Sequence, residues 1–144
     1  MVLPSIASSI LSGKVISGNG RGRKIGFPTA NVDIGRKVRK SEAGVFAATI
    51  DWDCSENTFG AVVNIGLRPT FVDRDLTLTI EAHILDFSGD LYGTAVTIQM
   101  LKKLREERRF LEVEELCRQL SIDVEHARAI IEKISTTSIR IFGE

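Results

Sequence analysis

The chain has 144 residues, and its 19 lysines and arginines balance 19 aspartates and glutamates, so its formal net charge is zero. This length suits one domain that buries a core without disulfide or metal staples, and the balanced charge creates no field that would draw the protein to nucleic acid or an anionic membrane. Two cysteines and two histidines, far apart, do not form the pattern of a zinc ribbon or a redox motif. The start lacks a basic signal region, and no segment has the length of a membrane span. We therefore expect a cytoplasmic protein that binds neither nucleic acid nor membrane.

The first element predicted in chain order is a strand that leads into a glycine-rich loop, within residues 11–35. Short apolar and β-branched runs between turn-forming residues predict further strands at 44–51, 59–65, 76–85 and 95–101. In the run 76–84 apolar residues alternate with polar ones, which indicates one core face and one polar face. The spacing predicts an antiparallel barrel or sandwich.

The pattern changes after Phe110, where apolar residues recur at three- and four-residue steps over 113–134, as on one stripe of a helix. Ser121 could divide this segment, so one helix and a helical pair both remain open. The tail 138–142 either adds a strand or lies over the core. We predict a single, mainly β domain over residues 1–144, closed on one side by the helical segment.

The glycine-rich stretch at 18–31 reads GNGRGRKIGFPTAN. Glycines let backbone amides approach a phosphate, and the intervening cations complement its charge. The stretch does not match a P-loop, because Lys24 follows Arg23 and precedes Ile25, and it does not match the dinucleotide fingerprint, which needs a glycine at position 23. A phosphate site and a plain surface loop both remain open.

Thr29 and Asn31 follow Pro28 at a spacing of two, so in extended chain their side chains share a face. A hydroxyl and an amide oxygen suit Mg²⁺, which completes its shell with water and nucleotide phosphates. Local turn hydrogen bonds would explain the same residues. Glu81 is the carboxylate on the polar face of the run 76–84, and it is a general base if that face lines a cleft and a solvated side chain if it does not.

Five blocks in order, GNGRGRKIGFPTANV, AGVFAATI, AVVNIGLRPTF, IEAHILDFSGDLYG and LREERRF, resemble riboflavin kinases, including the kinase half of bacterial bifunctional FAD synthetases. The resemblance implies a six-stranded antiparallel Greek-key-type barrel with a C-terminal helix. It also implies transfer of the γ-phosphate of ATP to the 5′-hydroxyl of riboflavin, which gives FMN, with Mg²⁺ as the cation.

Site residues follow from the resemblance by position. It implies Thr29 and Asn31 at Mg²⁺ and the phosphates, Glu81 as the catalytic base, and Arg105 and Glu107 at the flavin ring. Glu106 stands where many relatives have proline, and Asn64 and Arg68 lie in a matching block without an assigned contact. The residues implied at the nucleotide are Gly18, Gly20, Arg21, Gly22, Lys24 and Gly26.

Two alternatives remain beside a riboflavin kinase. The chain could be the kinase half of an FAD synthetase, although it offers no second nucleotide-binding fold, or it could be a flavin sensor without turnover. Retention of Thr29, Asn31 and Glu81 favours an enzyme over a sensor. The partners we expect are the small-molecule substrates riboflavin and ATP. We expect the protein to be a monomer.

Overall fold

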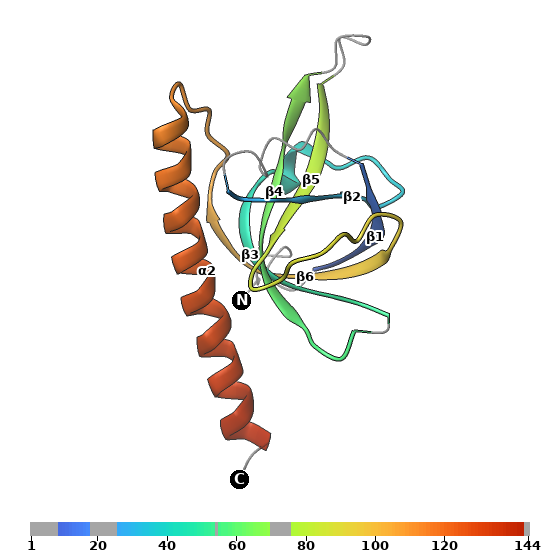
Figure 1. The fold of residues 1–144 in the computed structure, drawn as a ribbon, viewed down its shortest axis with the longest axis vertical. Coiled ribbons are helices and arrows are strands. Elements are labelled where there is room, and N and C mark those ends of the chain that lie inside the picture. The colour runs from blue at the N-terminus through green and yellow to red at the C-terminus, as the bar shows by residue number, and fades with distance from the viewer. Residues whose placement is uncertain (1–8, 18–25, 54, 70–75, 143–144) are drawn as a thin grey trace.

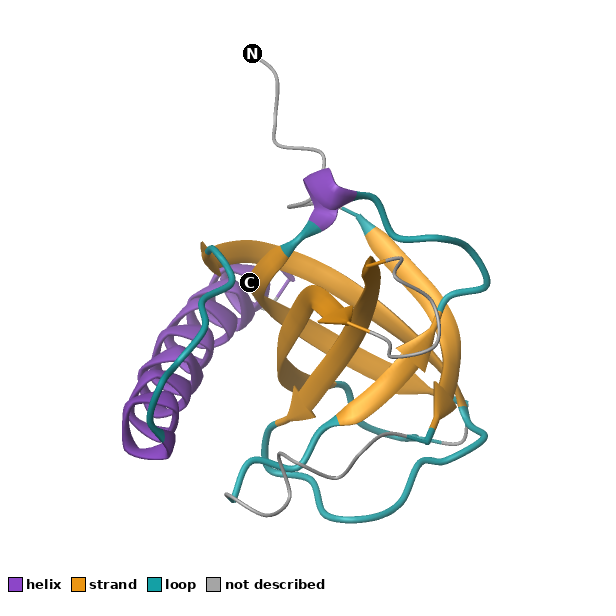
Figure 2. Ribbon diagram, turned by 90° about the horizontal axis from the view of Figure 1, so that it is seen from above, coloured by secondary structure: helices purple, strands orange, loops and turns teal. Residues whose placement is uncertain are grey.

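The computed structural model describes residues 9–17, 26–53, 55–69 and 76–142. Its strands close into a barrel, and one long helix runs along the outside (Figure 1). Viewed from above, the helix stands beside the barrel and leaves the barrel interior to the strands (Figure 2). The elements are β1 (Ile10–Ile16), β2 (Ala30–Asp33), β3 (Gly44–Trp52), β4 (Phe59–Pro69), β5 (Leu76–Ile84), β6 (Ala95–Arg105) and α2 (Val113–Phe142), with a 3-10 turn, η2 (Lys40–Glu42), before β3.

The strand order is β1-β2-β5-β4-β3-β6, with β6 paired back onto β1 and every neighbour antiparallel. Three hairpin-connected strands, β3 to β5, follow one another, and β2 reaches the far side of β5 through the long connection before β3. That arrangement is a Greek key. The six-stranded antiparallel barrel expected from the resemblance is confirmed.

The two faces of the sheet bury different apolar clusters. Inside the barrel, alternate residues of every strand pack together, among them Phe46, Ile50, Val63, Ile80 and Ile98. The outer face is covered by α2 along part of its surface, in a second cluster that consists of Val45, Ala47, Val62, Leu85 and, from the helix, Ala127. The alternation predicted for β5 is confirmed for Ile80, Ala82 and Ile84, which are buried, and for Glu81 and His83, which are only half-buried.

Three sequence-based expectations need correction. Periodicity did not identify β2 as a strand, because it has only four residues and pairs with strands distant in sequence. The helical pair is wrong: α2 is continuous through Ser121, whose side chain is exposed on the helix surface. Residues 138–142 continue the same helix and do not form a strand.

In the part of the chain that the structure describes, no helix is both long and apolar enough to cross a membrane.

The connection between β2 and β3 is held by Glu42. Nη1 and Nη2 of Arg36 each donate to its carboxylate at 3.0 Å, and the backbone N–H of Arg39 donates to the same group at 3.0 Å. Hydrogen bonds from Arg36, and then from Arg39, lower the pKa of Glu42 from 4.5 to about 2. Because the folded-state pKa is depressed, the stabilisation is present above pH 4.5 and is lost as the pH falls toward 2.

Replacing Glu42 with glutamine should therefore lower the free energy of unfolding at pH 7. The loss should be no more than about 1 kcal/mol, because Arg36 is exposed and water screens the pair. Denaturant titrations of both proteins at several pH values measure the difference. It should shrink between pH 4.5 and 2, and a constant difference over that range would show that the charge of Glu42 does not cause it.

Candidate functional site

Three polar side chains lie next to one another on the outer face of the barrel, one from each of three neighbouring strands. Asn31 of β2 is directly opposite Glu81 of β5, and Glu81 is directly opposite Asn64 of β4. Directly opposed residues in antiparallel strands have Cβ atoms about 5 Å apart. We call Asn31, Glu81 and Asn64 the outer-face row.

The row is shielded from water to different degrees. Asn31 is 9% exposed, whereas Glu81 is half-buried, so part of the Glu81 side chain is open to solvent. The side-chain oxygen of Asn64 is buried and has no hydrogen-bond partner among the described residues. A partly exposed carboxylate between two amides can accept a proton from a hydroxyl while the amides orient that hydroxyl's neighbours.

Thr29 lies two residues before Asn31, where the chain enters β2, and its side chain is exposed. Thr29 and Asn31 therefore offer two neutral oxygen ligands at one end of the row, a donor set that suits Mg²⁺ shared with phosphate. Within the described residues, no group of three or more His, Cys, Asp or Glu side chains could hold a metal by itself.

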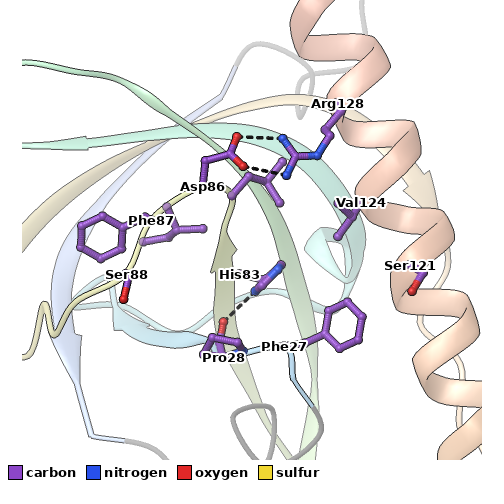
Figure 3. Close-up of a pocket in the computed structure, with 11 residues that line it drawn as sticks. Phe27, Pro28, His83, Asp86, Phe87, Ser88, Ser121, Val124 and Arg128 are labelled. Atoms are coloured by element: carbon purple, nitrogen blue, oxygen red, sulfur yellow. Dashed lines mark hydrogen bonds and ion pairs between the residues drawn. The ribbon is translucent and has the colours of Figure 1, made fainter.

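A cavity of about 540 Å³ opens between the end of β5 and α2 (Figure 3). His83 lies on the same outer face as Glu81, two residues further along β5, and its Nδ1 donates to the backbone oxygen of Pro28 at 2.7 Å. The ring of Phe27 meets His83 edge-on, with centroids 5.5 Å apart. The segment that precedes Thr29 thus forms one wall of the cavity.

The opposite wall comes from α2 and from the turn after β5. Arg128 of α2 donates to both carboxylate oxygens of Asp86, at 2.8 and 2.9 Å (Figure 3). This hydrogen bonding lowers the pKa of Asp86 and raises that of Arg128. The residues that line the cavity are Phe27, Pro28, His83, Ile84, Leu85, Asp86, Phe87, Ser88, Ser121, Val124 and Arg128.

At the other side of the row, Arg105 at the end of β6 forms an ion pair with Asp123 of α2. Its Nε and Nη2 donate to the two carboxylate oxygens at 2.9 and 2.8 Å, and Gln119 donates to the same carboxylate at 3.0 Å. Asp123 is 1% exposed. Sequence analysis missed Asp123, although a carboxylate inside the apolar stripe of a helix signals a buried partner.

Glu107 lies in the segment between β6 and α2, and its carboxylate occupies the space where a side chain of Gly66 would be. Gly66 is two residues from Asn64 on the same strand, and therefore on the same outer face. A Cβ at position 66 would overlap the carboxylate, so the absence of a side chain there is what admits Glu107. Glu107 thus lies beside the outer-face row.

The structure places Asn31 directly opposite Glu81, with Thr29 two residues before Asn31 at the entry to β2, and the roles of these three residues stay predictions. Arg105 and Glu107 lie at the far side of Asn64, and their contact with a flavin stays a prediction, since most of the hydrogen bonds of Arg105 go to Asp123. Gly26 has φ +90°, which favours glycine in the turn before Phe27. The remaining nucleotide residues predicted above lie outside the described part of the chain: Gly18, Gly20, Arg21, Gly22 and Lys24.

A family model described as Flavokinase, riboflavin kinase, matches residues 7–131. Over 120 residues the chain is 41% identical to a bifunctional riboflavin kinase/FMN adenylyltransferase of Pseudomonas fluorescens. The aligned region covers 83% of this chain and 37% of that protein. It is 40% identical over 118 residues to the RNA-binding riboflavin kinase RibR of Bacillus subtilis, covering 81% of this chain and 48% of RibR. The chain thus spans less than half the length of these relatives.

Solved structures show the same fold. A Streptococcus pneumoniae protein described as a macrolide-efflux protein superposes with a TM-score of 0.73 at 30% identity, over 84% of this chain and 38% of that one. A riboflavin kinase from Trypanosoma brucei superposes with a TM-score of 0.63 at 24% identity, over 94% and 87% of the two chains. The match of the family model over most of the chain shows that this protein belongs to the riboflavin kinase family.

Proposed function

We propose that the chain transfers the γ-phosphate of ATP to the 5′-hydroxyl of riboflavin and so forms FMN. The family uses ATP, and the observation that carries the proposal is the outer-face row, in which Glu81 lies between Asn31 and Asn64. The half-buried carboxylate can take the proton of an attacking hydroxyl. Phosphoryl transfer otherwise depends on positioning and on charge stabilisation, which suits a site with a single base.

Mg²⁺ would be held by the side-chain oxygens of Thr29 and Asn31. Two neutral oxygens are few ligands for this cation, which usually shares its shell with water and nucleotide phosphates. When bound, the cation supplies positive charge that offsets the charge on the transferring phosphoryl group. Asn31 is largely buried and lies directly opposite Glu81, so the strand pairing sets the separation between a cation there and the base.

The two substrates would approach Glu81 from opposite sides. The cavity beside Phe27, Pro28 and His83 adjoins the segment that follows the glycine-rich loop, so we assign it to the nucleotide. Arg105 and Glu107 lie beyond Asn64, on the side we assign to the flavin ring. The γ-phosphate and the ribityl 5′-hydroxyl then meet at Glu81.

We further propose that residues 1–144 make up one riboflavin kinase domain, which acts as a monomer in the cytoplasm on these two small molecules. We also propose that it does not bind nucleic acid, because its net charge is zero. The name of the relative RibR makes RNA the appropriate control ligand for this proposal.

Incubation of the purified chain with riboflavin, ATP and Mg²⁺, followed by separation of the flavins, tests the proposed reaction. FMN should accumulate, and FAD should not form in this chain alone, because its described residues form one barrel with one helix. Substantial FAD would reveal an adenylyl-transfer site. A chain that binds riboflavin without forming FMN would be a flavin sensor.

A further inference from the structure

One atom of the outer-face row has no explained role, the side-chain oxygen of Asn64. It is buried and lacks a hydrogen-bond partner among the described residues. A buried acceptor left without a donor is costly in a native fold, and such atoms are uncommon. The oxygen therefore calls for a donor that is not part of the described protein.

The described side chains directly beside Asn64 on the sheet do not supply that donor. Glu81 lies directly opposite on β5, and Glu107 lies over Gly66 on the same strand face, and ionised carboxylates only accept hydrogen bonds. On the other neighbouring strand Asn64 faces Val45, which is apolar and 2% exposed. These described neighbours of Asn64 thus offer acceptors and hydrocarbon, and a hydroxyl donor would complete the site.

We propose that Asn64 is a further substrate-binding residue, whose side-chain oxygen accepts a hydrogen bond from the 4′-hydroxyl of the ribityl chain. This inference rests on the proposed function. Glu81 takes the proton of the 5′-hydroxyl. Because Asn64 is directly opposite Glu81, their Cβ atoms are about 5 Å apart, so two adjacent hydroxyls of one polyol can reach the two side chains. Asn64 fixes the ribityl chain so that the 5′-oxygen points along the row toward the phosphate.

The same geometry distinguishes Asn64 from the nucleotide ligands. Asn31 and Thr29 lie on the β2 side of Glu81, whereas Asn64 lies on the β4 side, next to Glu107. Loss of the Asn64 oxygen should therefore weaken the binding of riboflavin and leave the ATP and Mg²⁺ requirements unchanged. Loss of a cation ligand would do the reverse.

The test compares Asn64→Leu, which keeps the branched shape and the number of side-chain heavy atoms without polar atoms, with Thr49→Val as the matched control. Thr49 is also half-buried on the outer face, but it lies four residues along β3 from Val45, opposite Gly60. Riboflavin affinity is measured by quenching of flavin fluorescence, and KM is measured for riboflavin and ATP separately. Asn64→Leu should lower the affinity for riboflavin about 10-fold, which is the scale of one lost hydrogen bond. Thr49→Val should leave that affinity unchanged.

A riboflavin analogue with hydrogen in place of the 4′-hydroxyl identifies the group and does not depend on the folding of any variant. The wild-type chain should bind it about 10-fold more weakly than riboflavin, and Asn64→Leu should bind both flavins equally. The proposal would be overturned if Asn64→Leu kept the wild-type affinity for riboflavin. It would also be overturned if the variant needed more ATP or Mg²⁺ and its riboflavin affinity did not fall. Equal binding of both flavins by the wild type would overturn it as well.

These outcomes are separate from failure of the proposed function. If the wild type binds riboflavin but forms no FMN, the proposed function fails, and the affinity comparison still decides the role of Asn64. If the wild type binds no riboflavin, both proposals are wrong.

Discussion

Replacing Glu81 with glutamine is expected to lower kcat for FMN formation by about 10²- to 10⁴-fold, the range for loss of a general base. Glutamine keeps the size of the side chain and an oxygen that accepts hydrogen bonds, but its neutral amide cannot take the proton of the 5′-hydroxyl. The KM values for riboflavin and ATP should change little, because neither the residues assigned to the nucleotide nor those assigned to the flavin are altered. Steady-state kinetics with each substrate varied in turn measures both parameters.

A control for Glu81→Gln is Glu56→Gln, which makes the same chemical change at an exposed position in the turn between β3 and β4. It should leave kcat unchanged. Circular dichroism and the denaturation midpoint of each variant check the fold, which should survive because Glu81 is only half-buried on the outer face. A folded Glu81→Gln variant with near-normal kcat would remove Glu81 as the base and leave positioning as the source of catalysis.

Replacing Asp123 with asparagine is expected to lower the free energy of unfolding by about 3 kcal/mol, because it leaves the charge of Arg105 without its buried partner. Asp123 is 1% exposed, and Arg105 donates to both of its oxygens. The pair joins the end of β6 to α2, on either side of the segment that carries Glu107. Chemical denaturation of the variant and the wild type measures the loss.

The chain contains a matched control, because Asp86 and Arg128 form a second two-point pair between the barrel and α2. The side chain of Asp86 is 72% exposed, so Asp86→Asn should leave the free energy of unfolding nearly unchanged. The double replacement Arg105→Met with Asp123→Leu should recover much of the stability lost in Asp123→Asn, since apolar side chains can substitute for a buried pair. Equal losses for Asp123→Asn and Asp86→Asn would show that burial does not set the strength of the Arg105 pair.

The strands were predictable where one face is core and the other is not. In β5 the alternation of Ile80, Ala82 and Ile84 with Glu81 and His83 marked both the strand and the orientation of Glu81. Alternation cannot identify β2, whose four residues are held by pairing with β1 and β5. The ends of β4 and β6 also extend past the predicted apolar runs, because backbone pairing continues through polar residues.

The candidate site was predictable only in part. The sequence motifs identify Asn31 and Glu81 as candidates, but their direct opposition depends on the register of β2 against β5, which no local pattern contains. The position of Glu107 depends on the missing side chain of Gly66, and the pairing of Arg105 with Asp123 joins residues 18 positions apart. Contacts of this kind arise from tertiary packing, so residue spacing along the chain does not reveal them.

We locate phosphoryl transfer at the outer-face row, and the decisive measurement for this claim is the Mg²⁺ dependence of FMN formation in Asn31→Ala. Removal of the Asn31 oxygen should raise the Mg²⁺ and ATP concentrations needed for half-maximal rate and should also slow the transfer. Asn57→Ala, at an exposed position between β3 and β4, is the control and should match the wild type. A folded Asn31→Ala protein with wild-type Mg²⁺ and ATP requirements would contradict the claim and place the reaction elsewhere on the molecule.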